Sequence, residues 1–223
     1  MNYRQRKIIP KGIIALLFLC FYLIGGCDVD FSTDGNNGGG GGGNNKTETI
    51  QGTIVSIVPN QNVQGITVSI SIDNSTPVTA VTNASGFFSI DGAFAGNPQI
   101  SFTDTKSNPL GISILNVFPT AQVDLGGITL DSGTVNFQAQ ALVTFDGNVT
   151  TNNCTGNSGS LQVDASNSQG STTVLVQISS STTLVDKNGN SITCASILTG
   201  NSVQVQGTIS SGNTVDATRV DIN

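Results

Sequence analysis

Short segments in which apolar and polar residues alternate recur along the chain from residue 53 to its end. A period of two places the apolar residues on one face of an extended strand. Turn-forming residues separate the segments at close intervals, and no stretch has a convincing helical period. The segments are 53–57, 66–72, 77–82, 87–90, 100–102, 112–115, 127–130, 135–145, 161–163, 173–178, 203–209 and 217–222. This pattern predicts an all-β protein built from antiparallel strands.

The first thirty residues follow a different pattern. A basic start is followed by an apolar block from Ile13 to Ile24 and then by small residues. A helix that crosses a bilayer needs about 20 apolar residues, and Pro10-Lys11 prevents extension of this block toward the N-terminus. The pattern is therefore typical of a signal peptide, and a transmembrane helix is the less favoured interpretation.

The end of the apolar block is Leu23-Ile24-Gly25-Gly26-Cys27, which resembles the lipobox of bacterial lipoproteins. The resemblance implies cleavage between Gly26 and Cys27, with fatty acyl chains such as palmitate attached to the cysteine. Two or more chains give a stable anchor, whereas one gives a marginal anchor. The alternative is an ordinary signal peptide in which Cys27 is incidental. Asp28 resembles the inner-membrane retention signal of enteric bacteria, but inner and outer membrane both remain open.

Loss of residues 1–26 makes the chain strongly acidic. The remaining chain has four cationic residues, Lys46, Lys106, Lys187 and Arg219, and keeps all 14 acidic residues, so its net charge is about −10. Such a surface repels nucleic acid and anionic lipid headgroups, so neither is expected as a ligand. The mature chain also lacks histidine, tryptophan and tyrosine, which weakens a sugar-stacking hypothesis.

The four cysteines have separate expected roles. Cys20 leaves with the signal peptide and Cys27 carries the lipid, which leaves Cys154 and Cys194 as an even pair. In an exported protein such a pair predicts a disulfide, whose loop of about 40 residues contributes about 3 to 4 kcal/mol. The alternative is a zinc or redox site, which the absence of histidine and of a Cys-x-x-Cys motif disfavours.

Composition divides the chain into four parts. A signal peptide spans 1–26, and the acylated cysteine with a Gly/Asn-rich tether spans 27–47. The stretch 34–45 is a flexible coil with a root-mean-square span of about 20 Å. Two folded units follow, at 48–131 and 132–223.

The first folded unit resembles the carboxypeptidase regulatory-like domain, a transthyretin-like antiparallel β-sandwich. The matching segments are 52–55, 63–70, 82–90 and 123–130, whereas 97–109 departs from the family pattern. The Ser85-Gly86 turn needs a positive φ, which glycine supplies. The resemblance implies no peptidase activity, and it implies that the module acts as a stalk, spacer or assembly unit.

The second folded unit resembles a small OB-like β-barrel domain of unknown function from exported bacterial proteins. The matching segments are 181–184, 198–207 and 217–220, and Asp146-Gly147 is interpreted as a turn. The cysteine pair departs from the family pattern. In this interpretation it ties the first third of the barrel to the turn before its fourth strand. OB folds bind oligonucleotides or oligosaccharides, but the acidic balance argues against nucleic acid.

Candidate chemistry is sparse. Asp186, Asn188 and Asn190 are spaced like the start of a calcium loop, but position twelve is Ile197, so Asn188-Gly189 favours a hairpin turn. Ser158 lies in an incomplete nucleophile motif, with Lys106 and Lys187 as remaining bases and no histidine. Each acidic residue is isolated, which disfavours a carboxylate pair for glycoside hydrolysis.

The sequence therefore predicts a non-enzymatic, exported, lipid-anchored cell-envelope protein without cofactor or metal. Presentation, adhesion or assembly with another envelope protein is the leading hypothesis, with the folded part in the periplasm or at the cell surface. The alternative is a module that binds a glycan or small ligand on the barrel or sandwich face. A concave pocket lined by polar groups would favour that alternative.

Overall fold

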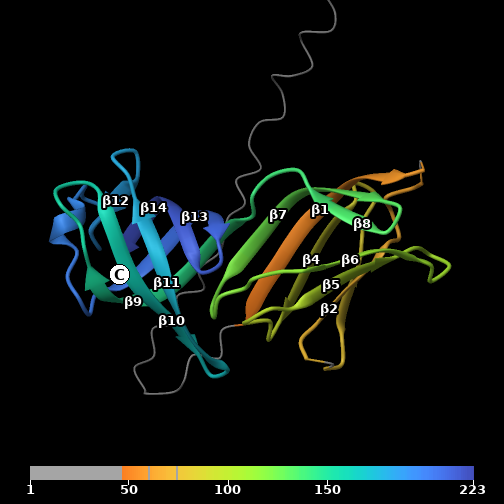
Figure 1. Cartoon of the computed structure of the whole chain (residues 1–223), viewed down its shortest axis with the longest axis horizontal. Coiled ribbons are helices and arrows are strands. Elements are labelled where there is room, and N and C mark those ends of the chain that lie inside the picture. The colour runs from red at the N-terminus through yellow and green to blue at the C-terminus, as the bar shows by residue number, and fades with distance from the viewer. Residues whose placement is uncertain (1–46, 60, 74) are drawn as a thin grey trace, which may run out of the picture. The chain divides into compact units, whose positions relative to one another are not determined.

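The computed structural model describes residues 47–59, 61–73 and 75–223, and this part of the chain is all-β (Figure 1). The signal peptide, the cleavage site at Gly26 and Cys27, and the tether up to residue 46 lie outside the described residues. Among the helical segments that are described, none has the length and apolarity needed to cross a bilayer.

The first eight strands form a two-layer β-sandwich. One layer has the order β4-β1-β7 with β8 added to β7, and the other has the order β3-β2-β5-β6. The strands are β1 (Glu48–Val58), β2 (Thr67–Ser71), β3 (Val78–Val81), β4 (Phe87–Gly92), β5 (Gln99–Thr103), β6 (Pro109–Ile114), β7 (Gln122–Asp131) and β8 (Thr134–Phe137).

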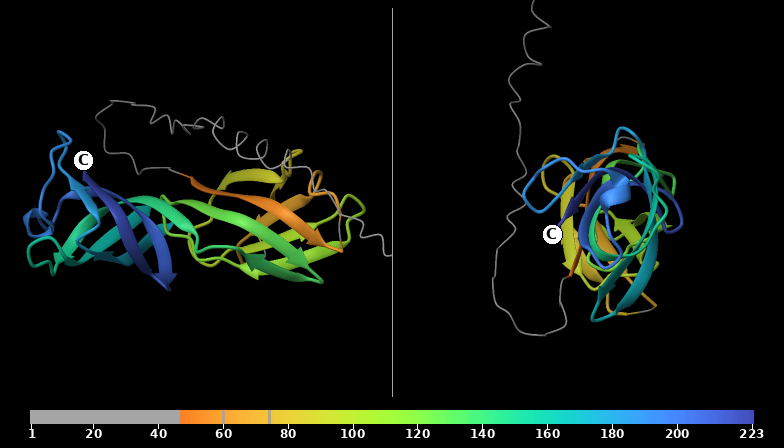
Figure 2. Two further views of the ribbon diagram at one scale, coloured as in Figure 1. Left: turned by 90° about the horizontal axis from the view of Figure 1, so that it is seen from above. Right: turned by 90° about the vertical axis from the view of Figure 1, so that its left-hand side faces the viewer.

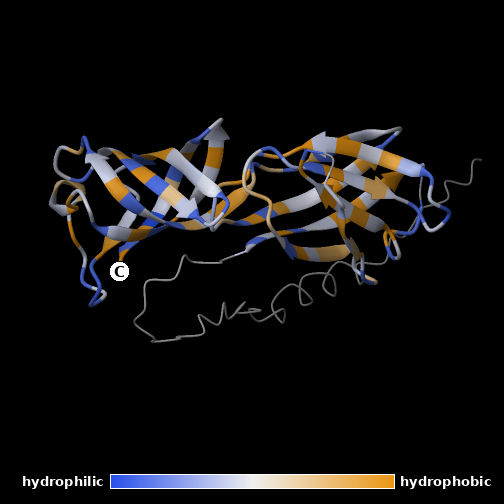
Figure 3. Cartoon of the chain, turned by 90° about the horizontal axis from the view of Figure 1, so that it is seen from below, coloured by the Kyte–Doolittle hydropathy of each residue, from blue (hydrophilic) through white to orange (hydrophobic). Residues whose placement is uncertain are grey.

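The apolar residues of the alternating segments form the core between the two layers. Figure 3 shows apolar and polar positions alternating along the strands. Ile54 from one layer and Ile70 from the other are fully buried. Phe88 meets Phe102 edge to face, with 6.1 Å between ring centroids, so an aromatic pair joins the layers. Burial of each such side chain contributes about 1.5–3 kcal/mol.

One strand pair of the sandwich differs from the predicted antiparallel arrangement. β1 pairs with β4 antiparallel but with β7 parallel. The chain crosses to the other layer between β4 and β7, so β7 returns beside β1 in the same direction. The prediction of uniformly antiparallel pairing is wrong here, because a period of two reports which face is buried and not the direction of the neighbouring strand. The predicted Ser85-Gly86 turn is present, with φ of +80° at Gly86.

Five of the remaining strands close into a barrel (Figure 2). The pairing runs β9-β10-β11-β14-β13 and back to β9, with β11 and β14 parallel. β12 pairs with β14, and a short 3₁₀ turn, η1, precedes β13. The elements are β9 (Leu142–Asn152), β10 (Gly159–Asn167), β11 (Gly170–Ile178), β12 (Thr183–Val185), η1 (Cys194–Ser196), β13 (Ser202–Ser211) and β14 (Thr214–Ile222).

The barrel interior is filled by side chains. Phe145, Leu161, Val176 and Val205, one from each of four strands, are almost fully buried. Phe145 also packs edge to face against Phe118 of the β6–β7 loop, with centroids 5.5 Å apart. A barrel of this size has an interior that its own side chains occupy.

The predicted turn at Asp146-Gly147 is wrong, because β9 continues through both residues. A Cβ atom on Gly147 would lie 2.6 Å from Cγ1 of Val163 and 2.8 Å from the carbonyl oxygen of Asp164. The glycine therefore serves close approach of β10 to β9 rather than a reversal of the chain. The segment 135–145, predicted as a long strand or a bent pair, is a bent pair formed by β8 and the start of β9.

The sandwich and the barrel share a sheet. Residues 122–124 of β7 pair with residues 142–144 of β9, so hydrogen-bonded strands run from β4 through β7 into the barrel. The sheet therefore joins the two folded units by backbone pairing.

Glu48, the first residue of β1, supports this junction from inside. Its side chain is 0% exposed. One carboxylate oxygen, Oε2, accepts from the Phe94 N–H at 2.8 Å. The other, Oε1, accepts from the Thr120 N–H at 3.0 Å and from Nδ2 of Asn167 at 2.7 Å. Asn167 belongs to the β10–β11 hairpin, so one carboxylate contacts three segments that are distant in the sequence.

Candidate functional site

An apolar groove opens between the ends of β6 and β8, where the edge of the sandwich meets β13 of the barrel. Its volume is about 250 Å³. Eight of its ten lining residues are apolar and the other two carry amides, so no charged residue lines it. They are Ile114, Leu115, Asn116, Val123, Leu125, Phe137, Ala139, Gln140, Ala141 and Ile209.

The two strands whose ends line the groove are joined at one point. A single parallel bridge joins Gly111 of β6 to Gly133, just before β8. The strands approach closely there, since a Cβ atom on Gly111 would lie 2.8 Å from Cγ2 of Val135. The groove lies further along both strands, with Ile114 on one lip and Phe137 on the other.

The floor and the lips of the groove differ in exposure. Val123 and Leu125 of β7 form a buried floor at 2% and 3% exposure. The lips are open, because Ile114 is 70% exposed and Phe137 is 36% exposed. Large apolar side chains that remain open around a hollow indicate a contact surface.

Two hydrogen bonds to the barrel hold one end of the groove. Nδ2 of Asn116 donates to the carbonyl oxygen of Gly212 at 2.6 Å and to Oδ1 of Asn213 at 3.3 Å. Both acceptors lie in the β13–β14 turn. Asn116 is therefore held in place, and Gln140 is the second amide at this surface.

The sequence did not single out this groove. Its alternating pattern predicts an ordinary strand over 112–115 and makes Phe137 one apolar position in a longer alternating run. The available signal was that Ile112 and Ile114 lie on one face of a strand whose exposed face should be polar. Glu48 was missed as well, since one glutamate in a polar region gives no sign of burial.

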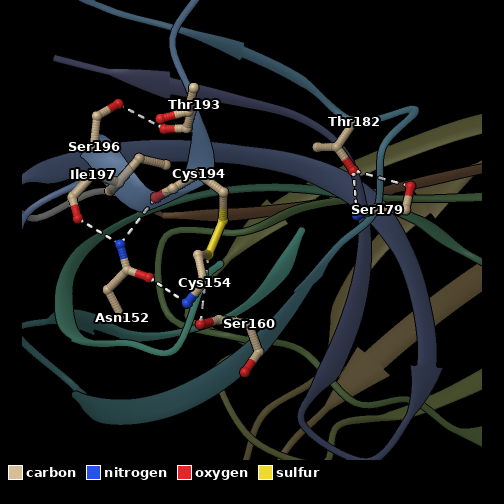
Figure 4. The surroundings of a disulfide bond; sticks show 9 residues. All are labelled: Asn152, Cys154, Ser160, Ser179, Thr182, Thr193, Cys194, Ser196 and Ile197. Carbon is tan, nitrogen blue, oxygen red and sulfur yellow. Dashed lines mark hydrogen bonds between the residues drawn. A yellow bond between two sulfur atoms is a disulfide. The ribbon is translucent and has the colours of Figure 1, made fainter. Parts of the chain in front are cut away.

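The predicted disulfide between Cys154 and Cys194 is confirmed, with Cα atoms 5.6 Å apart. It joins the β9–β10 loop to η1, ahead of the fourth strand of the barrel. Figure 4 shows Asn152 bridging the same two segments. Its Nδ2 donates to the carbonyl oxygens of Cys194 at 2.9 Å and Ile197 at 2.6 Å, and its Oδ1 accepts from the Cys154 N–H at 2.7 Å.

The predicted hairpin turn at Asn188-Gly189 is confirmed, with φ of +80° at Gly189. Oδ1 of Asp186 accepts from the N–H groups of Asn188 at 2.9 Å and Asn190 at 2.8 Å, and Oδ2 accepts from Nδ2 of Asn190 at 3.1 Å. These hydrogen bonds, led by the one from the Asn190 side chain, lower the pKa of Asp186. The loop itself thus uses both carboxylate oxygens that a calcium ion would need.

Residues 104–108 form a second loop of the same design, between β5 and β6. Asp104 accepts from the N–H groups of Lys106 and Asn108, each at 2.8 Å, and from Nδ2 of Asn108 at 2.8 Å. The Asn108 side chain is the main cause of its lowered pKa. Ser107 occupies the position of the glycine in the first loop, with φ of +65°.

The other candidate residues lie apart in the fold. Ser158 is in the β9–β10 loop, where its N–H donates to the carbonyl oxygen of Thr155 at 3.4 Å. Lys106 and Lys187 each lie within one of the two aspartate loops. Within residues 47–223, apart from the two masked positions, no three His, Cys, Asp or Glu side chains gather as a metal site would require.

No known family matches this chain, and neither the curated proteins nor the solved structures yield a match.

Proposed function

We propose that this chain is an exported, lipid-anchored envelope protein that acts without catalysis, through assembly with another envelope protein. The lipobox-like segment ending in Gly26-Cys27 is the observation that carries the anchoring part of the proposal. The described fold begins with β1 at Glu48, directly after the Gly/Asn-rich tether. This order of segments suits a folded unit held away from a membrane by a flexible spacer.

The groove supports assembly more than catalysis. It is apolar and uncharged, whereas an active site normally contains converging titratable groups with perturbed pKa values. The two aspartates whose pKa is lowered belong to exposed loops and are stabilised by the loops' own amides. A surface of exposed apolar side chains is suited to protein contact.

The barrel supports an OB-like identity by its strand order. Numbered within the barrel, the closed order is 1-2-3-5-4-1, and strands 3 and 5 are parallel. In OB folds, strands 2 and 3 and the loops 1–2 and 4–5 bind oligonucleotides or oligosaccharides. Here the loop 4–5, the β13–β14 turn, accepts hydrogen bonds from Asn116 of the sandwich. The sandwich therefore occupies part of that surface.

The charge on the outside of the barrel argues against nucleic acid as the ligand. Asp164 of β10 and Asp216 of β14 lie on strand positions that face away from the filled interior. Negative charge at these positions repels phosphates. Glycan binding is the second candidate, but the groove is apolar rather than lined by the converging polar groups that favour a sugar.

Mass spectrometry of the protein purified from membranes tests the anchoring. We expect a mature N-terminus at Cys27 that carries diacylglycerol and a further fatty acyl chain. Replacement by Cys27→Ser should shift the protein from the membrane to the soluble fraction, because a single thiol bears the anchor. Unchanged membrane association of this variant, or an unmodified N-terminus elsewhere, would refute the proposal.

A further inference from the structure

We propose that the groove between β6 and β8 accepts an extended segment of a partner protein. The segment would add as a strand beside β6 and place uncharged, β-branched side chains on the groove floor. This inference deepens the assembly role proposed above, and it does not depend on the lipid anchor.

The first support is the backbone of β6. This strand ends its sheet, so it pairs along its length with β5 alone among the strands described. Its other edge makes a single bridge, at Gly111, and the strand reaches the groove at its last residue, Ile114. An edge strand offers N–H and C=O groups to an incoming strand, which is the basis of recognition by strand addition.

The second support is the lack of protection on this edge. Proteins usually block exposed edges with charges, prolines or bulges. β6 has proline at its first residue, Pro109, and its register against β5 shifts between Pro109 and Gly111, but residues 112–114 pair with β5 in regular register and contain no proline or charge. Instead it exposes Ile112 at 56% and Ile114 at 70%. An unprotected apolar edge invites aggregation unless a partner covers it.

The size of the groove favours a few side chains over a whole small molecule. Pockets for drug-sized ligands hold about 300–1,000 Å³. The groove, at about 250 Å³, is smaller and is open at its lips. Side chains at alternate positions of a strand point to the same face, so two of them could reach the floor made by Val123 and Leu125.

The charge of the surface restricts the partner. Across the described residues, acidic side chains greatly outnumber the three cations Lys106, Lys187 and Arg219. The groove itself is uncharged, so the side chains that enter it must be uncharged too. Residues flanking the inserted strand gain from being basic, whereas a second copy of this acidic chain is repelled.

Titration with a defined peptide tests this inference on the full mature chain. The probe is a seven-residue peptide of alternating threonine and valine with a lysine at each end. Backbone amide chemical shifts should change in a saturable way by about 1 mM peptide, chiefly within residues 112–116 and 134–141. Two control peptides should fail: one with N-methylated amides, which cannot donate to β6, and one with lysine in place of each valine.

Matched variants locate the contact. Ile114→Lys should weaken peptide binding by about tenfold or more, and Phe137→Lys should act in the same direction. Val81→Lys is the control, because Val81 is 63% exposed on β3, the opposite edge of the same sheet. Because Ile114 is mostly exposed, its variant should fold even if Phe137→Lys does not.

Several results would overturn the inference. They are absence of saturable shifts at about 1 mM, shifts centred on β3, equal binding of the N-methylated peptide, or full binding by Ile114→Lys. Chemical-shift changes that depend on protein concentration alone would indicate that a second copy of the chain occupies the groove, and they would also refute the inference. A failure of lipid attachment at Cys27 would leave peptide binding unchanged, so the two proposals fail separately.

Discussion

Removal of the Glu48 carboxylate should destabilise the junction between the sandwich and the barrel. In Glu48→Ala, the N–H groups of Phe94 and Thr120 lose the acceptors that now lie at 2.8 and 3.0 Å. Nδ2 of Asn167 loses an acceptor at 2.7 Å. The two N–H groups lie in the β4–β5 and β6–β7 loops, whereas Nδ2 of Asn167, at the end of β10, also donates to Oε1 of Gln169 at 2.9 Å and keeps that acceptor.

The magnitude follows from two opposing effects. Two buried N–H groups left without an acceptor cost about 1–3 kcal/mol each, and the partly buried amide costs less. Removal of a buried carboxylate also releases its desolvation cost, which offsets part of this loss. We therefore expect Glu48→Ala to lower the free energy of unfolding by about 2–4 kcal/mol. The free energy of unfolding of Glu48→Gln should lie between those of this variant and the wild type, because the glutamine amide places its own donor against one of the three N–H groups.

Denaturant titration followed by far-ultraviolet circular dichroism measures the effect. Tryptophan fluorescence is not an option because the chain contains no tryptophan. Thr49→Val is the control, because the hydroxyl of neighbouring Thr49 donates to Asp91 in an exposed pair that should contribute little. If the free energy of unfolding of Glu48→Ala lies within about 0.5 kcal/mol of the wild-type value, the carboxylate does not stabilise the junction and the reasoning fails.

Three further perturbations test other parts of the fold by the same titration. Loss of the disulfide, through Cys154→Ala with Cys194→Ala, should lower the free energy of unfolding by about 4 kcal/mol, because the unfolded chain gains the freedom of a 40-residue loop. Ser107→Gly should raise it by about 1 kcal/mol, since a non-glycine residue with φ of +65° is strained. Gly147→Ala should lower it by about 1–3 kcal/mol, because the added methyl group would overlap the neighbouring strand β10.

For each of these predictions, one result would contradict the reasoning. A disulfide effect below about 1 kcal/mol would mean that the loop is already ordered in the unfolded chain. The reciprocal variant Gly189→Ser should destabilise the second aspartate loop, and a stabilising effect there would contradict the shared design. Normal stability of Gly147→Ala would show that β9 and β10 can separate without cost.

The sequence predicted the strands well wherever one face is buried. Alternation located β2, β4, β11 and β13 to within a few residues, because each has a buried face and a solvent-facing side. It failed at Gly147, where Asp-Gly has the composition of a turn but the glycine serves close strand packing. It also could not give the parallel pairing of β1 with β7, since strand direction depends on where the chain crosses between layers.

The sequence by itself determined the class of the fold, the cysteine pair and the hairpin turn at Gly189. Each follows from local chemistry, namely period-two burial, an even count of thiols and a residue that tolerates positive φ. The tertiary structure alone decided that Glu48 is buried and that an apolar groove lies open beside Ile114. Both depend on contacts between segments more than 20 residues apart in the chain, and the local pattern of one segment does not encode which distant segment will cover it.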